Sequence, residues 1–155
     1  MRLTIIRGPS GTGKSTIARY IKDYWAKNST TQLVICEADD YFINERGEYY
    51  RDVTKLQLAH RACYLKAKLA MENKQPVVIS DTSIKRRDIR GYIMLAESYN
   101  YGVEIIRTPG PWDPNELTKR NKHRVPLEAI KRQIDRYQQH EREFEWKVMD
   151  IFKHE

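Results

Sequence analysis

The sequence predicts an α/β fold built on a doubly wound parallel sheet, and three observations support this prediction. Short apolar runs rich in β-branched residues alternate with longer segments whose apolar residues recur every three to four positions. Such alternation is typical of a parallel sheet with helices on both faces. The first apolar run leads through a glycine-rich loop into a helical pattern, and carboxylates follow the second and third runs. We therefore expect a sheet of about four to five strands with a ligand site at its carboxyl edge.

The expected elements follow one another along the whole chain. Continuous apolar runs predict four buried strands, at 3–7, 33–36, 76–81 and 103–107. Helical periodicity predicts a first helix from residue 16 to the loop at 28–31, and further helices at 54–73, 85–100, 116–123 and 127–152. The segment 108–114 contains too many prolines for a helix or a central strand.

The glycine-rich loop, Gly8–Ser15, matches the phosphate-binding pattern G-x-x-x-x-G-K-[ST] without a mismatch. Its glycines allow the backbone to approach a phosphate, and its N–H groups lie at the positive end of the helix dipole. Lys14 is expected to reach the β- and γ-phosphates of ATP, and the Ser15 hydroxyl to ligate Mg²⁺. The predicted nucleotide contacts in the loop are Gly8, Ser10, Gly11, Thr12, Gly13, Lys14, Ser15 and Thr16. The fold is therefore expected to be of the P-loop NTPase type.

Composition places further bounds on the protein. A chain of 155 residues is most simply a single domain, 1–155. The net charge of +7 favours a polyanionic partner, although nucleotide phosphates also account for part of it. No apolar run is long enough to span a membrane, and the first strand leaves no room for a signal peptide. Two isolated cysteines make no disulfide framework, and a cytoplasmic location is expected.

Carboxylates after two strands are candidates for chemistry. Asp39 follows the second strand and is the candidate catalytic base, which would accept a hydroxyl proton and orient the oxygen. Asp40 either holds a substrate group or caps the next turn. Asp81 ends the third strand and is expected to support Mg²⁺ through water, or alternatively to cap the following helix. His60 and His140 have no partners at metal-ligand spacing, so a zinc site is not expected.

A basic segment after the fourth strand is the candidate lid, at about 113–126. It contains the run Lys119–Arg124, and guanidinium groups can neutralise transferring phosphate oxygens. Arg120 is the first candidate for this catalytic and nucleotide-binding role, and Arg124 is the second. The alternative is a solvated charged surface.

The combination of these parts favours a small kinase over other nucleotide-binding proteins. A guanine-specifying Asn-Lys-x-Asp motif is absent from the sequence, which disfavours GTP, and the chain is short for a motor or remodelling ATPase. A phosphate loop, a base, a metal-supporting acid and a cationic lid are the parts that phosphoryl transfer requires.

The last expected helix, about 127–152, carries an apolar stripe in which the spacing mostly alternates between four and three residues. The stripe consists of Ile130, Ile134, Tyr137, Phe144, Val148 and Ile151. The helix either docks on its own domain or forms a homo-oligomer through a coiled-coil seam.

These residues together resemble the kinase module of the polynucleotide 5′-hydroxyl kinase family, found in phage and nucleic-acid repair enzymes. The resemblance extends from Leu3 to about Tyr137. It rests on the loop and Thr16, on Asp39-Asp40-Tyr41, on 78–82, on Pro111-Trp112, and on Leu117-x-Lys119-Arg120-Asn121 followed by Val125-Pro126.

The resemblance implies ATP and Mg²⁺ as cofactors and a 5′-hydroxyl end of DNA or RNA as acceptor. It implies that Asp39 is the base and that Arg120 or Arg124 clamps ATP phosphates. The sequence departs from the phage-type pattern at Phe42, where that pattern has an arginine for the acceptor's phosphate; Arg46 or Arg51 is a candidate replacement. Two alternatives remain: a small-molecule kinase for a nucleoside, nucleotide or nucleotide sugar, and an ATP-binding interaction module with little turnover.

Overall fold

The computed structural model describes residues 1–83 and 86–152, with side chains described within 1–83 and 87–139. Over these residues the α/β prediction is confirmed. Four strands form one parallel sheet in the order β2-β3-β1-β4. The strands are β1 Arg2–Arg7, β2 Val34–Cys36, β3 Val77–Ser80 and β4 Gly102–Arg107.

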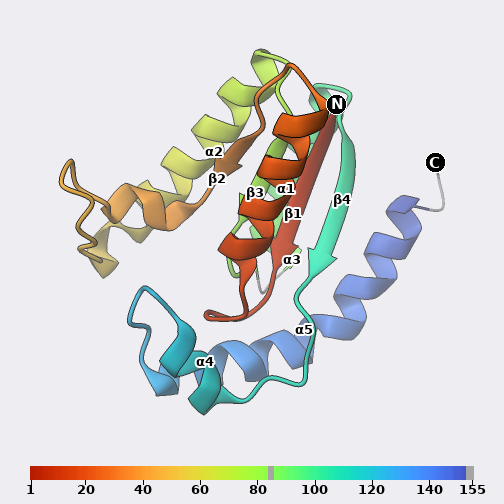
Figure 1. Cartoon of the computed structure of the whole chain (residues 1–155). Coiled ribbons are helices and arrows are strands. Elements are labelled where there is room, and N and C mark those ends of the chain that lie inside the picture. The colour runs from red at the N-terminus through yellow and green to blue at the C-terminus, as the bar shows by residue number, and fades with distance from the viewer. Residues whose placement is uncertain (84–85, 153–155) are drawn as a thin grey trace.

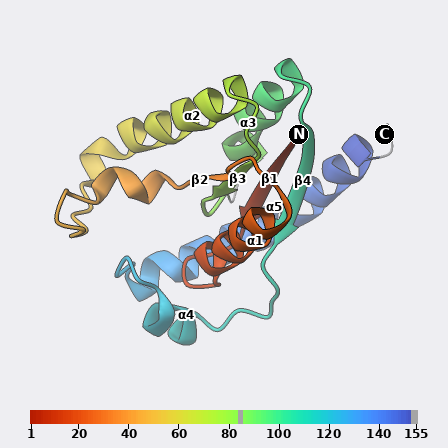
Figure 2. The ribbon, with the colours of Figure 1, turned by 45° about the horizontal axis from the view of Figure 1, so that its top comes forward.

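Helices cover both faces of the sheet, as Figure 2 shows with α2 and α3 on one side and α1 on the other. The helices are α1 Lys14–Asn28, α2 Leu56–Glu72, α3 Arg86–Ser98, α4 Pro114–Arg120 and α5 Leu127–Phe152. Two short 3₁₀ helices, η1 Ala38–Phe42 and η2 Val53–Lys55, lie between β2 and α2.

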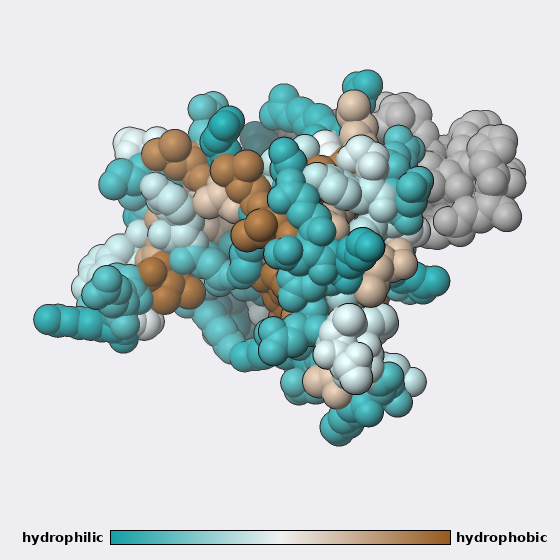
Figure 3. Space-filling view, turned by 90° about the horizontal axis from the view of Figure 1, so that it is seen from above, coloured by the Kyte–Doolittle hydropathy of each residue, from teal (hydrophilic) through white to brown (hydrophobic). Residues whose placement is uncertain are grey.

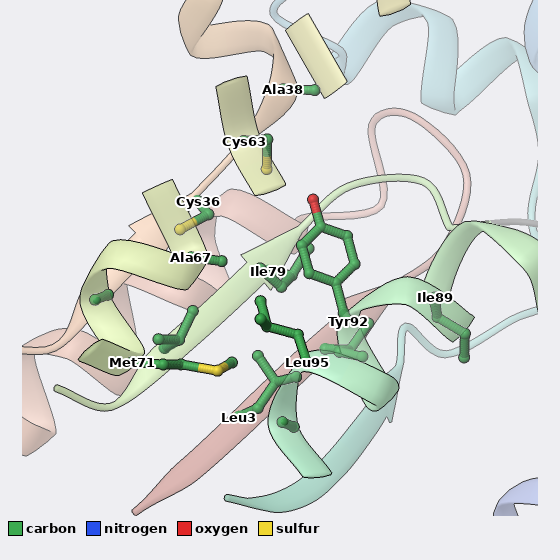
Figure 4. Packing of buried hydrophobic residues seen from close by; sticks show 14 of the residues in the cluster. Leu3, Cys36, Ala38, Cys63, Ala67, Met71, Ile79, Ile89, Tyr92 and Leu95 are labelled. Atoms are coloured by element: carbon green, nitrogen blue, oxygen red, sulfur yellow. The ribbon is translucent and has the colours of Figure 1, made fainter. Parts of the chain in front are cut away.

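Alternation along the strands divides the core into two layers, because successive side chains point to opposite faces. Leu3, Ile5 and Ile79 pack beneath α2 and α3, in the layer drawn in Figure 4. Ile6 and Val78 face the other way and pack with Ala18 of α1. Both cysteines are free and buried in the α2 and α3 layer, where burial raises the pKa of Cys36 to about 12.

The carboxyl ends of the strands face α4 and α5. Figure 1 shows the β1 and β4 arrows pointing toward the edge of the sheet that α5 crosses. The first part of α5 docks on the protein itself: Ile130, Ile134 and Tyr137 are buried, and the first two pack against Leu117 of α4 and Val125. The side chains of Phe144, Val148 and Ile151 lie outside the described residues, so self-association through this helix stays a prediction.

The boundaries of the lid helix differ from the sequence prediction. The helix was expected at 116–123, but α4 begins at Pro114 and ends at Arg120. It begins early because the Asp113 carboxylate caps it by accepting the Asn115 N–H at 2.9 Å, and proline is well suited to the first helical turn. It ends early because the Asn121 side chain bonds across the next turn, accepting the Val125 N–H at 2.7 Å.

The surface is mostly hydrophilic, as the teal colouring of the face in Figure 3 shows, with separate brown hydrophobic places. This agrees with the charged content of 32%. Among the described residues, no helix combines the length and hydropathy that a membrane span requires.

Candidate active site

A pocket of about 400 Å³ opens at the carboxyl edge of the sheet, between the β1–α1 loop, η1 and the lid. It brings together residues that are far apart in the sequence. Of the predicted site residues, those lining it are Ser10, Gly11, Gly13, Lys14, Ser15, Thr16, Asp39, Asp81 and Arg120. Gly8, Thr12 and Arg124 are not among the lining residues.

The loop that follows β1 has the backbone that its glycines predict. Gly11 has φ +82°, and a Cβ placed there would collide with the carbonyl oxygen of Leu117 in α4. Gly8 lies deeper, where a Cβ would collide with the Oγ1 of Thr108. The Thr12 hydroxyl donates to the Pro9 carbonyl at 2.8 Å. Gly8 and Thr12, which do not line the pocket, therefore stabilise the conformation of the loop. Gly11 lets the lid helix α4 pack directly against the loop.

The Lys14 ammonium turns back on its own loop. Its Nζ donates to the carbonyl of Gly8 at 2.9 Å and to that of Pro9 at 2.8 Å. Burial lowers the pKa of Lys14 to about 8, although the nearby carboxylates of Asp81, Asp39 and Glu37 oppose this shift. A half-buried ammonium that donates to two loop carbonyls is well placed to exchange them for the charged oxygens of a polyphosphate.

Asp39 lines the same pocket and is held from two sides. The Tyr49 hydroxyl donates to its Oδ1 at 2.9 Å. His123 Nε2 lies 3.5 Å from its Oδ2, and the Tyr49 and His123 rings are 4.6 Å apart. The Asp39 side chain is still 40% exposed, so a substrate hydroxyl has access to it.

Asp81 joins the ends of β3 and β2. Its Oδ1 accepts the Ala38 N–H at 3.0 Å, and the Cys63 thiol lies 3.8 Å from its Oδ2. Burial raises the pKa of the Asp81 carboxyl, against the lowering effect of the Ala38 N–H and of His60. The alternative role as a cap for the following helix concerns residues next to the undescribed positions 84–85 and stays untested.

The donor set around Lys14 fits Mg²⁺ that arrives with a nucleotide. Ser15, Asp81 and Glu37 offer hard oxygen ligands in one pocket. The described residues include no cluster of three or more His, Cys, Asp or Glu side chains able to hold a metal alone. Mg²⁺ usually binds through one or two side chains, waters and substrate phosphates.

The lid contributes cations to the pocket. Arg120, Lys122 and His123 line it, whereas Arg124 is exposed, with φ +53°, and lies outside the lining. The structure therefore brings the first lid candidate, Arg120, to the site, and does not bring the second.

Some of the remaining residues considered in the sequence analysis line the pocket, and others lie outside it. Asp40 lies outside the pocket lining and pairs with Lys66 at 3.7 Å, so its predicted substrate contact has no support from the geometry. Of the two replacements considered for an acceptor-binding arginine, Arg51 lines the pocket and Arg46 does not. Phe42, at the position where the phage-type pattern has an arginine, is buried in the core and also lines the pocket.

The pocket lining also includes Tyr49, His60, His123 and Gln133, none of which the sequence analysis gave a part in the transfer. Gln133 of α5 accepts the Ser10 N–H through Oε1 at 2.9 Å, across 123 positions of sequence. No local pattern indicates such a contact. A signal did exist for His123, because it belongs to the basic lid run, and for Tyr49, which belongs to a tyrosine-rich loop.

Comparison with known proteins identifies the family of this chain. The sequence profile described as "AAA domain" matches residues 3–141. The chain belongs to this AAA domain family. Human NEDD4-binding protein 2 is 36% identical over 141 residues, which cover 88% of this chain and 8% of that protein. The chain thus spans only a small part of this relative.

Solved structures agree on the fold, which is that of P-loop kinases. A chain of the Pnkp1/Rnl/Hen1 RNA repair complex matches with a TM-score of 0.70 and 21% identity, covering 92% of this chain and 45% of that one. The APS kinase CysC of Mycobacterium tuberculosis, solved with AMPPNP and APS, matches with a TM-score of 0.59 and 13% identity, covering 77% and 67%. Both structural similarities establish the fold and do not identify the acceptor.

Proposed function

We propose that this protein is an ATP-dependent phosphotransferase that moves the γ-phosphate of ATP to the 5′-hydroxyl end of a DNA or RNA strand. The observation that carries this proposal is that Lys14 and Asp39 line one pocket, with the Asp39 carboxylate close enough to act on the pKa of Lys14, in a P-loop kinase-like fold. An ammonium for the phosphates and a carboxylate for the hydroxyl, in the same pocket, are two groups that transfer to a hydroxyl requires.

The residues have distinct roles in this proposal. Lys14 exchanges the carbonyls of Gly8 and Pro9 for β- and γ-phosphate oxygens. Asp39 accepts the proton of the attacking hydroxyl and directs its oxygen at the γ-phosphorus. Arg120 places positive charge beside the transferring phosphoryl group. Ser15 and Asp81 would hold Mg²⁺, which neutralises charge on the β- and γ-oxygens.

A nucleic-acid acceptor is supported by charge and by similarity. Arg51 and Lys122 line the pocket, and the chain carries a net charge of +7. Cations beyond the transfer site suit an acceptor that brings phosphates of its own. A chain of the RNA repair complex also matches with a TM-score of 0.70, against 0.59 for APS kinase.

A small-molecule kinase is the second candidate, favoured by the match to APS kinase and by Phe42 at the position of the expected acceptor-binding arginine. The experiment that separates the two is transfer of labelled γ-phosphate from ATP to a panel of 5′-hydroxyl oligonucleotides, nucleosides, nucleotides and nucleotide sugars. We expect the oligonucleotides to be labelled. Labelling of the small molecules alone would establish the second candidate.

The binding of single strands provides a separate check on the acceptor. For an oligonucleotide acceptor, the logarithm of the binding constant should fall with the logarithm of salt concentration by about 0.7 per phosphate contacted. Arg51→Gln should reduce this slope. The matched control is Arg46→Gln, since Arg46 lies outside the pocket lining. Equal slopes in both variants would remove Arg51 from the acceptor site.

A further inference from the structure

Side chains from the loop that follows η1 and from the lid meet at the Asp39 carboxylate, just after the end of β2. Asp39 lies in η1, Tyr49 returns to it from the loop, and His123 reaches it from the turn after α4. These three residues are called the Asp39 clasp below. Of the three, only Asp39 was expected to take part in the transfer step, so the clasp adds Tyr49 and His123 to the residues that act on it.

Tyr49 is fixed by its surroundings before it bonds to Asp39. Ile43 and Tyr49 form an antiparallel bridge, and the Tyr50 N–H donates to the Phe42 carbonyl at 2.9 Å. The Tyr49 ring packs edge-on against the Phe42 ring, with centroids 6.2 Å apart. Because backbone and ring are both held, the phenol can fix the direction of the Asp39 carboxylate with little further loss of freedom.

The two oxygens of Asp39 have different neighbours. Oδ1 accepts the Tyr49 O–H at 2.9 Å, a distance typical of a well-formed hydrogen bond. Oδ2 faces His123 Nε2 at 3.5 Å, a longer and weaker contact. A substrate hydroxyl that gives its proton to Asp39 needs one of these oxygens, and Oδ2 is the one that the weaker contact covers.

We propose that Tyr49 is a positioning residue that holds Asp39 through Oδ1, and that His123 covers Oδ2 until the acceptor hydroxyl replaces it. This inference rests on the proposed function, in which Asp39 is the base. In the step itself the Tyr49 proton stays on its oxygen. The acceptor proton passes to Oδ2 as the acceptor oxygen bonds to phosphorus and the bond from phosphorus to the leaving oxygen of ADP breaks.

The kinetic test uses Tyr49→Phe, which removes only the hydroxyl. Its matched control is Tyr50→Phe, since the Tyr50 hydroxyl bonds to Glu48 at 2.6 Å and the residue is 64% exposed and outside the pocket lining. We expect Tyr49→Phe to lower kcat about tenfold or more, the range for losing a hydrogen bond to a charged group, with the KM for ATP unchanged. Tyr50→Phe should match the wild type.

The test of His123 is a change in acceptor binding. If His123 covers Oδ2, His123→Ala should lower the KM for the acceptor, because the hydroxyl no longer displaces the imidazole. A raised KM would show that His123 binds the acceptor instead and would overturn this half of the inference.

A readout that needs no turnover is the NMR resonance of the His123 imidazole, assigned with His123→Ala. It should shift in Asp39→Asn and when a 5′-hydroxyl oligonucleotide binds without ATP, and stay in place in Tyr50→Phe. An insensitive resonance would overturn the contact.

Failure of the inference and failure of the proposed function give different results. If Asp39→Asn is slow and Tyr49→Phe is as fast as the wild type, the inference fails and the proposed function stands. If Asp39→Asn transfers as fast as the wild type, Asp39 is not the base, and the inference fails although transfer itself stands. If the wild type labels no 5′-hydroxyl oligonucleotide, the proposed function fails.

Discussion

Single residues of the site owe their chemistry to where the backbone places them. Lys14 is an ordinary lysine in sequence, yet burial among loop carbonyls lowers its pKa to about 8. The ends of β2 and β3 bring Asp81, Asp39 and Glu37 close enough to act against that shift. The ammonium is therefore near its titration point in the free protein at mildly alkaline pH.

This shift predicts a proton linkage to ATP binding. Below pH 8 the free protein already carries the charged ammonium, so ATP should bind without taking up a proton at Lys14. Above pH 8 the free lysine is mostly neutral, and the phosphates favour its charged form, so binding should take up about one proton and weaken up to about tenfold per pH unit.

The linkage is measurable by calorimetry at pH 6.5 and pH 9 in buffers of different ionisation enthalpy. Lys14→Met supplies the control, since its residual binding should lose this pH dependence. An affinity that stays flat from pH 7 to pH 9, with no proton uptake, would contradict the assignment.

At the scale of elements, the lid helix and the phosphate loop form one packed unit. Gly11 has its positive φ at the place where the loop touches the Leu117 carbonyl, and Gln133 of α5 accepts the Ser10 N–H. The structure thus ties both α4 and α5 to the loop that would hold ATP, although these helices follow it by about a hundred residues.

Gly11→Ala should damage the site more than the backbone strain alone explains. A Cβ at positive φ costs about 1–2 kcal/mol, and here it also meets the carbonyl of Leu117. Gly47→Ala is the matched control, with φ +78° and nothing within 4 Å of the added Cβ. We expect both variants to lose stability in urea and only Gly11→Ala to lose ATP affinity. Equal ATP affinities would show that this packing is not needed for binding.

The docking of α5 can be tested by its stability contribution. Ile130 is fully buried, and Ile130→Ala should lower the free energy of unfolding by about 2–5 kcal/mol through lost burial and a cavity. Gln138→Ala, at an exposed position of the same helix, should change it by less than about 0.5 kcal/mol. Similar values for the two variants would mean that this part of α5 does not pack on the protein as described.

Across the whole molecule, local patterns predicted the elements well and the contacts between distant segments poorly. The strands, the long helices and the phosphate loop follow from periodicity and from one motif, because each depends on neighbouring residues. The end of α4 was missed because the side chain of Asn121 bonds to Val125, which no periodicity reveals.

The candidate site shows the same difference between residues predicted from local motifs and residues brought in by long-range contacts. Lys14, Ser15, Asp39, Asp81 and Arg120 were expected on motif and position, and they line one pocket. Tyr49, His123 and Gln133 join them through contacts that span 10, 84 and 123 positions respectively. Only the sheet order and the return of the chain over its carboxyl edge bring such residues together.

The central claim is that Asp39 activates an acceptor hydroxyl in the pocket that Lys14 also lines. It is tested most directly by single-turnover transfer from ATP to a 5′-hydroxyl oligonucleotide in Asp39→Asn, beside Asp40→Asn as the neighbouring carboxylate outside the pocket lining. The prediction is a loss of about 10²–10⁴ in rate for Asp39→Asn, with ATP affinity retained, and near wild-type transfer for Asp40→Asn. Equal rates in the two variants would contradict the claim.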